Sequence, residues 1–158
     1  MTKKHRLPEA AYFGEVAVAI TACEARRRQV FADPAVIPVF IVELIQAVDK
    51  FACFVPIYCF MPDHLHLIIK GTEQRSRPKL AMERFKHQTG NWLKENAPNF
   101  EWQDDFYDHI IRKNEDLDAQ IQYIAANPMR AGLAENMLSH PHTGSIGCEL
   151  NDVLLSTY

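Results

Sequence analysis

Four segments of the chain have the residue pattern of β-strands. Residues 15–22 (EVAVAITA), 51–61 (FACFVPIYCFM) and 64–70 (HLHLIIK) are rich in β-branched and aromatic residues, which favour extended backbone. A fourth strand is expected near the end of residues 100–112 (FEWQDDFYDHIIR). Pro56 lies within the second segment. Because proline donates no hydrogen bond to a sheet, this strand is expected either at an edge or with a bulge.

Two helices are expected between these strands. Residues 39–50 repeat apolar side chains at helical spacing, after a helix start signal formed by Asp33 and nearby prolines. Ser76 is expected to cap a second helix, which continues to about Glu95 and ends before Pro98. The second and third strands are joined by only two residues, so they are expected to pair antiparallel.

A third helix is expected after the fourth strand. Asn114 is expected to cap it, with two acidic residues in the first turn, where the helix dipole favours negative charge. The helix is expected to stop near Asn127, because Pro128 disfavours the α conformation in the residue before it. From Ser139 to the C-terminus the apolar residues show little periodicity, and we expect this part to be irregular.

The order of these elements predicts the fold class. Strand, helix, strand, strand, helix, strand and helix is the order of a split βαβ unit, and it predicts an α+β, ferredoxin-like sandwich with an antiparallel sheet. A length of 158 residues suits one domain. We expect this domain to span residues 1–135, followed by a short tail at residues 136–158.

The composition is that of a globular protein. Hydrophobic residues make up 47% and charged residues 23% of the chain, which excludes a disordered or fibrous protein. No apolar run is long enough to span a membrane, and the basic N-terminus lacks the apolar stretch of a signal peptide. The four cysteines form no CxxC pair. We therefore expect a cytoplasmic protein with reduced thiols.

The charge of the chain is unevenly distributed. The formal net charge is −3, which argues against a generic polyanion binder. Residues 75–87 nevertheless hold five basic residues against one acidic residue, whereas residues 100–120 hold seven acidic residues against two basic ones. The basic residues of the first block, which are candidates for phosphate contacts, are Arg75, Arg77, Lys79, Arg84 and Lys86. A solvated helix surface is the alternative explanation.

Two histidines form a candidate metal site. Side chains at positions i and i+2 of a strand point to the same face, so His64 and His66 project together. Two imidazoles at this spacing can bind one metal ion. The alternative is two histidines on a half-exposed face of the sheet, without a ligand.

Tyr123 and Asn127 form a second polar pair, at positions i and i+4 of the third helix. They lie on one flank of that helix, beside rather than on the apolar stripe at Leu117, Ile121 and Ile124. A tyrosine on a flank suits chemistry at the surface, although packing at the rim of the core is the alternative. For Asn127 the alternative is termination of the helix.

Three motifs carry a resemblance to a known family. MPDHLHLIIK (61–70), WQDDFYDHIIR (102–112) and YIAANPMRAGL (123–133) occur in this order. Together they resemble the single-tyrosine transposases of the HUH superfamily, above all the REP-associated tyrosine transposases of bacteria. The resemblance extends over roughly residues 12–135 and implies a catalytic domain with the ferredoxin-like fold that the element order predicts.

The resemblance implies a role for each of the four polar residues. His64 and His66 match the two histidines that hold a divalent metal, Mg²⁺ or Mn²⁺, and Asn127 matches a third metal ligand. Tyr123 matches the nucleophile, which attacks a DNA phosphodiester and forms a 5′-phosphotyrosine and a free 3′-OH.

The resemblance also implies the substrate, which is single-stranded DNA with palindromes that fold into hairpins. Trp92, Trp102 and Tyr107 are available to stack on bases, although packing in the core is the alternative for each. The relatives are monomers or homodimers. The resemblance leaves open the target sequence, the metal, the oligomeric state and the roles of His109 and the tail.

Two other functions remain as alternatives. One is a module that binds hairpin DNA without cleaving it, which the combined presence of His64, His66 and Tyr123 disfavours. The other is a small metallohydrolase built on Asp63, His64 and His66. That enzyme needs further carboxylate or histidine ligands, and the sequence offers no clear extension of this motif.

Overall fold

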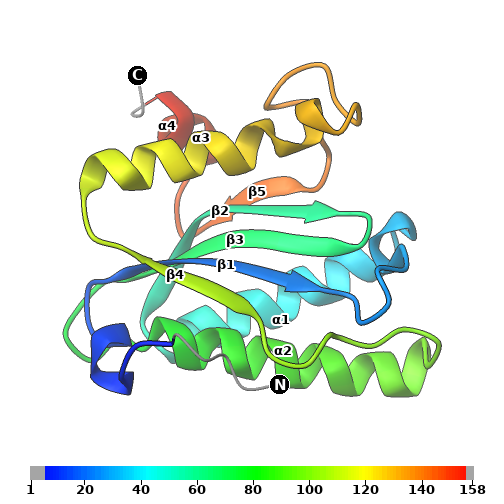
Figure 1. Ribbon diagram of the computed structural model, residues 1–158, viewed down its shortest axis with the longest axis horizontal. Coiled ribbons are helices and arrows are strands. Elements are labelled where there is room, and N and C mark those ends of the chain that lie inside the picture. The colour runs from blue at the N-terminus through cyan, green and yellow to red at the C-terminus, as the bar shows by residue number, and fades with distance from the viewer. Residues whose placement is uncertain (1–5, 156–158) are drawn as a thin grey trace.

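A five-stranded antiparallel sheet forms the centre of the molecule in the computed structural model, which describes residues 6–155. The strands are β1 (Ala17–Cys23), β2 (Cys53–Met61), β3 (His64–Gly71), β4 (Tyr107–Ile111) and β5 (Thr143–Ile146). The helices are α1 (Val36–Lys50), α2 (Pro78–Asn96), α3 (Asn114–Arg130) and α4 (Leu150–Leu155), with short 3₁₀ turns at η1 (Glu9–Tyr12) and η2 (Val30–Ala32). Figure 1 shows α1 and α2 on one face of the sheet and α3 and α4 on the other.

The strand order confirms the ferredoxin-like expectation. The sheet runs β4-β1-β3-β2-β5, and every neighbouring pair is antiparallel. The first four strands, connected through α1 and α2, are those of a split βαβ sandwich. The four expected strands and three expected helices are all present, and β5 and α4 are added to them.

The alternation of side chains along the strands divides the core into two layers. Val18 and Ile20 of β1 and Leu65 and Leu67 of β3 face α1 and α2, where Phe85 completes the layer. Residues of the opposite parity, among them Cys59 and Ile68, face Ile121 and Ile124 of α3. His64 and His66 have the parity of Ile68. The candidate metal site therefore lies on the α3 side of the sheet.

The sequence led us to expect an irregular C-terminal segment, and this expectation is wrong. Residues 143–146 form β5, which pairs with β2 through Tyr58 and Gly144, and α4 follows it. A strand of four residues is too short to show a periodic pattern, and its formation depends on pairing with a distant strand. Gly144 is required there, because a Cβ atom would lie 2.5 Å from the Tyr58 hydroxyl oxygen.

Pro56 produces a bulge, which confirms one of the two expected outcomes. The pairing of β2 with β3 shifts between Phe54 and Ile57, and the pairing with β5 shifts between Val55 and Tyr58. The other outcome, an edge strand, is wrong, because β5 covers the outer side of β2. The bulge accommodates the missing N–H of Pro56 inside the sheet.

The start of α2 differs from the expectation that Ser76 caps the helix. The N-cap is Arg77, and Pro78 occupies the first turn, where its missing N–H costs nothing. The Ser76 hydroxyl instead donates to the Ala52 carbonyl oxygen at 2.5 Å and accepts from the amides of Thr72 and Glu73. Ser76 thus fixes the loop before the helix to the end of α1.

Both ends of α3 also differ from the expectation. Lys113, not Asn114, is the N-cap, and Asn114 is the first helical residue. The helix continues through Pro128 to Arg130. Since Pro128 lies only two residues before the end, its ring interrupts the hydrogen-bond ladder of the last turn alone. The Leu133 amide closes that turn by donating to the Pro128 carbonyl oxygen at 2.8 Å.

Among residues 6–155, we find no helix that combines the length and the apolar character needed to cross a membrane.

Candidate active site

Two imidazoles lie side by side on the α3 face of β3. The ring centroids of His64 and His66 are 4.6 Å apart, and the ring planes meet at 86°. The register of the sheet places His64 opposite Cys23 of β1, and His66 opposite Thr21 of β1. The shared face predicted from their spacing is confirmed.

Each imidazole is held through its Nδ1 atom. His64 Nδ1 lies 2.6 Å from Asp63 Oδ1, and His66 Nδ1 lies 2.9 Å from Thr21 Oγ1. Asp63 in turn accepts a hydrogen bond of 2.9 Å from Arg27 Nε. A histidine held by a carboxylate or hydroxyl at one nitrogen presents the other nitrogen to a metal in a fixed direction. These contacts leave the Nε2 atoms as the nitrogens suited to bind a metal.

The site favours neutral His66 and charged Asp63. Burial lowers the pKa of His66 to about 4, and the positive charges of His64, Arg130 and Arg27 add to the effect. Burial alone would raise the pKa of Asp63, but hydrogen bonds from Arg27 and His64 lower it below its ordinary value. At neutral pH His66 therefore carries the lone pair that a metal requires.

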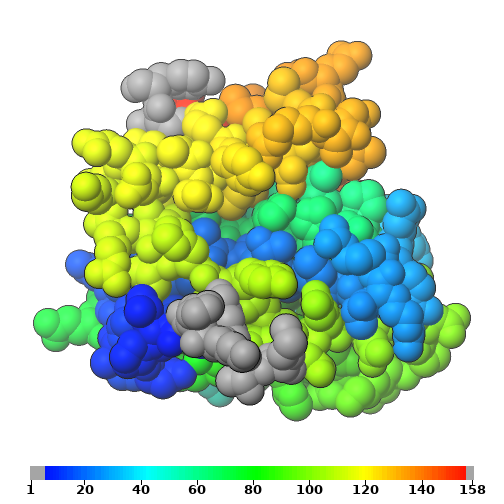
Figure 2. All heavy atoms as spheres, in the orientation of Figure 1, coloured from blue at the N-terminus to red at the C-terminus, as the bar shows by residue number. Residues whose placement is uncertain are grey.

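Tyr123 and His66 line the same cavity, which has a volume of about 280 Å³. It lies between α3 and the strands β1, β3 and β4. Its polar lining comprises Thr21, His66, Tyr107, Asp108, His109, Gln120 and Tyr123. In the space-filling view (Figure 2), residues around β1, in blue, reach the surface between α3, in yellow, and the segment around β4, in yellow-green. Tyr123 is 56% exposed, so a molecule in solution can reach it.

Arg130 connects Tyr123 with Asn127. Its guanidinium carbon lies 4.1 Å from the centroid of the Tyr123 ring. One of its terminal nitrogens donates to the Tyr123 carbonyl oxygen at 2.8 Å and to Asn127 Oδ1 at 3.4 Å. The flank of α3 predicted from the sequence thus has a third polar member.

The two imidazoles are donors that suit a metal ion, but no carboxylate cluster accompanies them in the described part of the chain. Within residues 6–155, no three His, Cys, Asp or Glu side chains are grouped so that they could bind a metal. A metal at His64 and His66 therefore needs oxygen ligands of another kind, such as the Asn127 amide or the oxygens of a bound phosphate.

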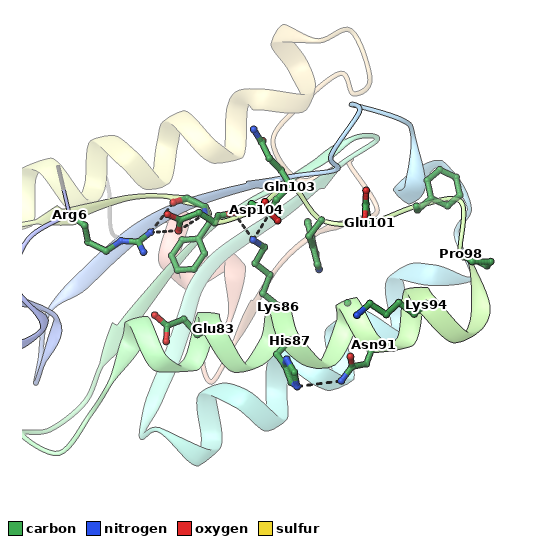
Figure 3. Close-up of a pocket in the computed structure, with 15 residues that line it drawn as sticks. Arg6, Glu83, Lys86, His87, Asn91, Lys94, Pro98, Glu101, Gln103 and Asp104 are labelled. Carbon is green, nitrogen blue, oxygen red and sulfur yellow. Dashed lines mark hydrogen bonds and ion pairs between the residues drawn. The ribbon is translucent and has the colours of Figure 1, made fainter. Parts of the chain in front are cut away.

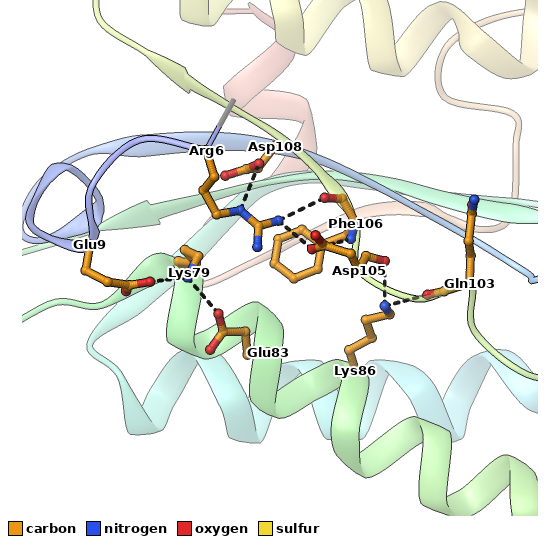
Figure 4. A network of polar contacts seen from close by, with 9 residues as sticks. All are labelled: Arg6, Glu9, Lys79, Glu83, Lys86, Gln103, Asp105, Phe106 and Asp108. Carbon is orange, nitrogen blue, oxygen red and sulfur yellow. Dashed lines mark hydrogen bonds and ion pairs between the residues drawn. The ribbon is translucent and has the colours of Figure 1, made fainter. Parts of the chain in front are cut away.

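The basic block of residues 75–87 lies away from this site. α2 packs on the sheet face opposite to the two histidines, and its apolar residues join the other layer of the core. Lys79 is only 5% exposed and binds Glu9 at 2.5 Å and Glu83 at 2.8 Å. Lys86 Nζ donates to the backbone oxygens of residues 103 and 105 (Figure 4). The ammonium groups of both lysines are thus engaged within the fold, and their expected contact with phosphates stays a prediction.

The remaining basic residues of the block also lie at a distance from the histidines. Arg77 stacks on Phe13, with its guanidinium carbon 3.8 Å from the ring centroid, and Arg75 forms an ion pair with Glu73. Arg84 is half-buried on α2. The structure does not bring Arg75, Arg77 or Arg84 together with His64 and His66.

A hollow larger than the cavity of Tyr123 lies apart from the histidines. It has a volume of about 610 Å³ and lies between α2 and residues 98–106 (Figure 3). Lys86, His87 and Lys94 line it, but so do Glu83, Glu101 and Asp104. Because charges of both signs meet there, this hollow is poorly suited to a polyanion.

The three aromatic residues proposed for base stacking lie in two different environments. Trp102 packs against Phe31, Phe40 and Phe85, and Trp92 packs against Phe40, so both contribute to the core. Tyr107 is 60% exposed and lines the cavity of Tyr123. His109, whose role the sequence left open, lines the same cavity.

Three residues near the site were not assigned to it by the sequence reasoning, namely Thr21, Arg27 and Arg130. Thr21 contacts His66 only through the pairing of β1 with β3, which no local pattern reveals. Arg27 reaches Asp63 from a loop, with a positive φ of 57°. Arg130 follows Tyr123 by seven residues and so lies on the same helix face. It was missed because the helix was expected to end at Asn127.

The chain is similar to known proteins in sequence and in fold. Residues 13–127, which include His64, His66, Tyr123 and Asn127, match the family model described as "Transposase IS200 like". A protein of Haemophilus influenzae, named as a REP-associated tyrosine transposase, is 27% identical over 96 residues. That match covers 54% of this chain and 54% of the relative, so the chain spans about half the length of this curated relative.

Two solved structures share the fold. The structure of a REP-associated tyrosine transposase bound to a REP hairpin matches with a TM-score of 0.73 and 20% identity, covering 90% of this chain and 82% of that one. A protein of Deinococcus radiodurans described as a transposase matches with a TM-score of 0.51 and 19% identity, covering 80% of this chain and 97% of that one.

Proposed function

Because the chain belongs to the family of IS200-like transposases, we propose that it nicks single-stranded hairpin DNA and transfers the cut strand. The curated relative named as a REP-associated tyrosine transposase and the solved relative bound to a REP hairpin support this choice of substrate. The family membership agrees with the resemblance of the three sequence motifs. The proposed reaction proceeds through a covalent bond between the enzyme and DNA.

One observation carries the proposal, which is that Tyr123 and His66 line one cavity. An exposed tyrosine on a helix and a half-buried imidazole on a strand, 57 positions apart in the sequence, meet there only through the fold. His64 lies against His66, and Asn127 is tied to Tyr123 through Arg130. These contacts support the proposal that the four residues act together at one site.

Tyr123 is the nucleophile in this mechanism. Its phenol oxygen attacks the phosphorus of a DNA phosphodiester and loses its proton in the process. The bond between the phosphorus and the 3′-oxygen breaks, and that oxygen leaves as a 3′-OH after taking up a proton. The products are a 5′-phosphotyrosine and a free 3′ end. Since the new phosphodiester stores the energy of the old one, a later 3′-OH can reverse the step and join strands.

His64, His66 and Asn127 would hold a divalent metal beside Tyr123. Mg²⁺ and Mn²⁺ are the candidates, and such an ion neutralises phosphate charge and orients the phosphate for attack. Asp63 and Thr21 fix the orientation of the two imidazoles through their Nδ1 atoms. The low pKa of His66, about 4, keeps its imidazole neutral for this role.

The metallohydrolase alternative loses support from the contacts of Asp63. Its two carboxylate oxygens bind His64 and Arg27, so the carboxylate orients a histidine instead of extending the ligand set. No group of three His, Cys, Asp or Glu ligands exists within the described part of the chain.

A denaturing-gel assay tests the proposal. Labelled single-stranded hairpins from the DNA that flanks the native gene are incubated with the protein and Mn²⁺ or Mg²⁺. We expect a metal-dependent covalent protein–DNA band, which Tyr123→Phe abolishes. Tyr58→Phe is the matched control, because Tyr58 packs with the core layer on the opposite face. Tight hairpin binding without any adduct would overturn the cleavage reaction and support a binding module instead.

A further inference from the structure

Arg130 occupies a position of α3 from which its side chain reaches both Tyr123 and Asn127. It lies seven residues after Tyr123 and three after Asn127, in the last turn of the helix. At 100° per residue, the three side chains emerge within about 60° of one another. This alignment exists only because α3 continues through Pro128 for two further residues.

The contacts of Arg130 hold two parts of the site at once. Its guanidinium lies over the face of the Tyr123 ring, with 4.1 Å from the guanidinium carbon to the ring centroid. At this distance a cation is attracted to the ring. One terminal nitrogen is anchored to the Tyr123 carbonyl oxygen at 2.8 Å and also lies 3.4 Å from Asn127 Oδ1. The guanidinium is thus fixed to the backbone and contacts both side chains.

Tyr123 needs such a partner. More than half of its side chain is exposed, so packing against the core restrains the ring only in part. A nucleophile must be held close to the line of attack, and a small misplacement of a reacting group slows a reaction strongly. Arg130 supplies a contact against the face of this ring.

We propose that Arg130 is a positioning residue, which holds the Tyr123 ring and the Asn127 amide in the arrangement required for attack on a DNA phosphate. This inference rests on the proposed function. It adds a residue with a defined task, which acts through Tyr123 and Asn127 and not by binding DNA.

The test separates positioning from DNA binding. Arg130→Ala, Arg130→Lys and the control Lys113→Ala are compared with the wild type. Lys113 carries the same charge at the opposite end of α3, about 25 Å away. The rate of covalent adduct formation is measured in single turnover with saturating hairpin DNA, and the Kd for the hairpin is measured without metal. Thermal melting checks that each variant is folded.

The expected result is a slower reaction at unchanged affinity. Arg130→Ala should form the adduct about tenfold more slowly or worse, with a Kd within about twofold of the wild type. Arg130→Lys should recover part of the rate, because an ammonium retains the attraction to the ring but not the planar fork. Lys113→Ala should react like the wild type.

A second readout does not depend on activity. In protein without DNA or metal, the NMR resonances of the Tyr123 ring should move in Arg130→Ala and stay in place in Lys113→Ala. A wild-type rate in Arg130→Ala, or a loss that appears only in Kd, would overturn the positioning role. Absence of any adduct from the wild type would overturn the proposed function instead, so the two failures are distinguishable.

Discussion

A single buried carboxylate organises the loop that follows β1. The side chain of Glu24 is only 1% exposed. Its oxygens accept hydrogen bonds from the amides of Arg26 at 2.7 Å, Arg28 at 3.0 Å and Glu101 at 3.1 Å. The loop between them carries Arg27, which binds Asp63 beside His64. One side chain therefore links the order of a loop to the orientation of an imidazole at the site.

Glu24 gives stability a defined pH dependence. Burial alone would raise the pKa of Glu24, but the three backbone amides and Arg28 lower it below the ordinary value. A glutamate with a lowered folded-state pKa stabilises the protein above its unfolded pKa of about 4.3, and this contribution is lost as the pH falls through the folded value. We expect Glu24→Gln to lower the melting temperature at pH 7, and the difference from wild type to shrink below about pH 4.

The measurement is a series of thermal melts between about pH 3 and pH 7. Glu95→Gln, at an exposed position near the end of α2, is the control and should follow the wild type at every pH. A difference between Glu24→Gln and wild type that stays constant across the series would contradict the assignment of this titration to Glu24.

Asp63 is expected to control metal affinity without binding the metal. Its Oδ1 atom lies 2.6 Å from His64 Nδ1 and fixes the direction of the ring. Removing the partner of a metal-binding histidine typically weakens affinity about 10- to 100-fold. We therefore expect Asp63→Asn to weaken Mn²⁺ binding within this range, as measured by calorimetry. Asp49→Asn, at an exposed position on α1, should bind as wild type does, and equal affinities of the two variants would refute the role of Asp63.

At the scale of elements, the pairing of β5 with β2 depends on Gly144. A Cβ atom at this position would lie 2.5 Å from the hydroxyl oxygen and 2.7 Å from the ring carbon of Tyr58. We expect Gly144→Ala to destabilise the protein by about 1–3 kcal/mol, because the rigid ring must shift. Urea denaturation measures this change in the free energy of unfolding.

A matched variant has the opposite expected sign. Gly90 lies inside α2, and a Cβ atom there would meet Trp102 at 3.8 Å, an ordinary contact distance. Gly90→Ala should therefore stabilise α2 by up to about 1 kcal/mol.

A double variant tests the contact between position 144 and the Tyr58 ring. Combining Gly144→Ala with Tyr58→Leu should recover stability, and strictly additive effects of the two substitutions would argue against this contact.

The elements differ in how far the sequence predicts them. β1, β2 and β3 follow from their β-branched and aromatic residues, and the shared face of His64 and His66 follows from the two-residue period of a strand. β5 could not be predicted, because its stability comes from pairing with a distant strand. The contact of Thr21 with His66 needs the same long-range register. The C-terminal end of α3 was expected too early. Pro128 disfavours the α conformation in the residue before it, but the packing of α3 in the fold outweighs this local preference, and the helix continues to Arg130.

At the scale of the whole molecule, the sheet separates two layers, and only one of them carries the histidines. α1 and α2 cover one face, while α3 covers the face of the histidines (Figure 1). β3 starts at His64 and ends at Gly71, a span of about 23 Å. Residues 72–77 and α2 follow from that far end. The basic residues at the start of α2 therefore lie on the other face of the sheet from the histidines. They also follow the end of β3 that lies opposite to His64.

Removing charge from the α2 side should thus leave DNA binding unchanged. We expect the double variant Arg75→Gln, Arg84→Gln to bind a hairpin with a Kd within about twofold of wild type, and with the same salt dependence. Fluorescence anisotropy at two salt concentrations measures both quantities. Binding that is tenfold weaker, with a smaller salt slope, would show that this surface does contact DNA phosphates.

The position of β5 has a consequence for how the protein behaves when it is shortened. In the intact sheet, β5 covers the outer edge of β2. A chain cut after residue 135, where the sequence alone suggests a domain boundary, would leave the N–H and C=O groups that β2 directs toward β5 without partners. An uncovered strand edge is a template on which another chain can pair. Loss of these twenty-three residues would then turn a sheet with a covered edge into one prone to join its neighbours and aggregate.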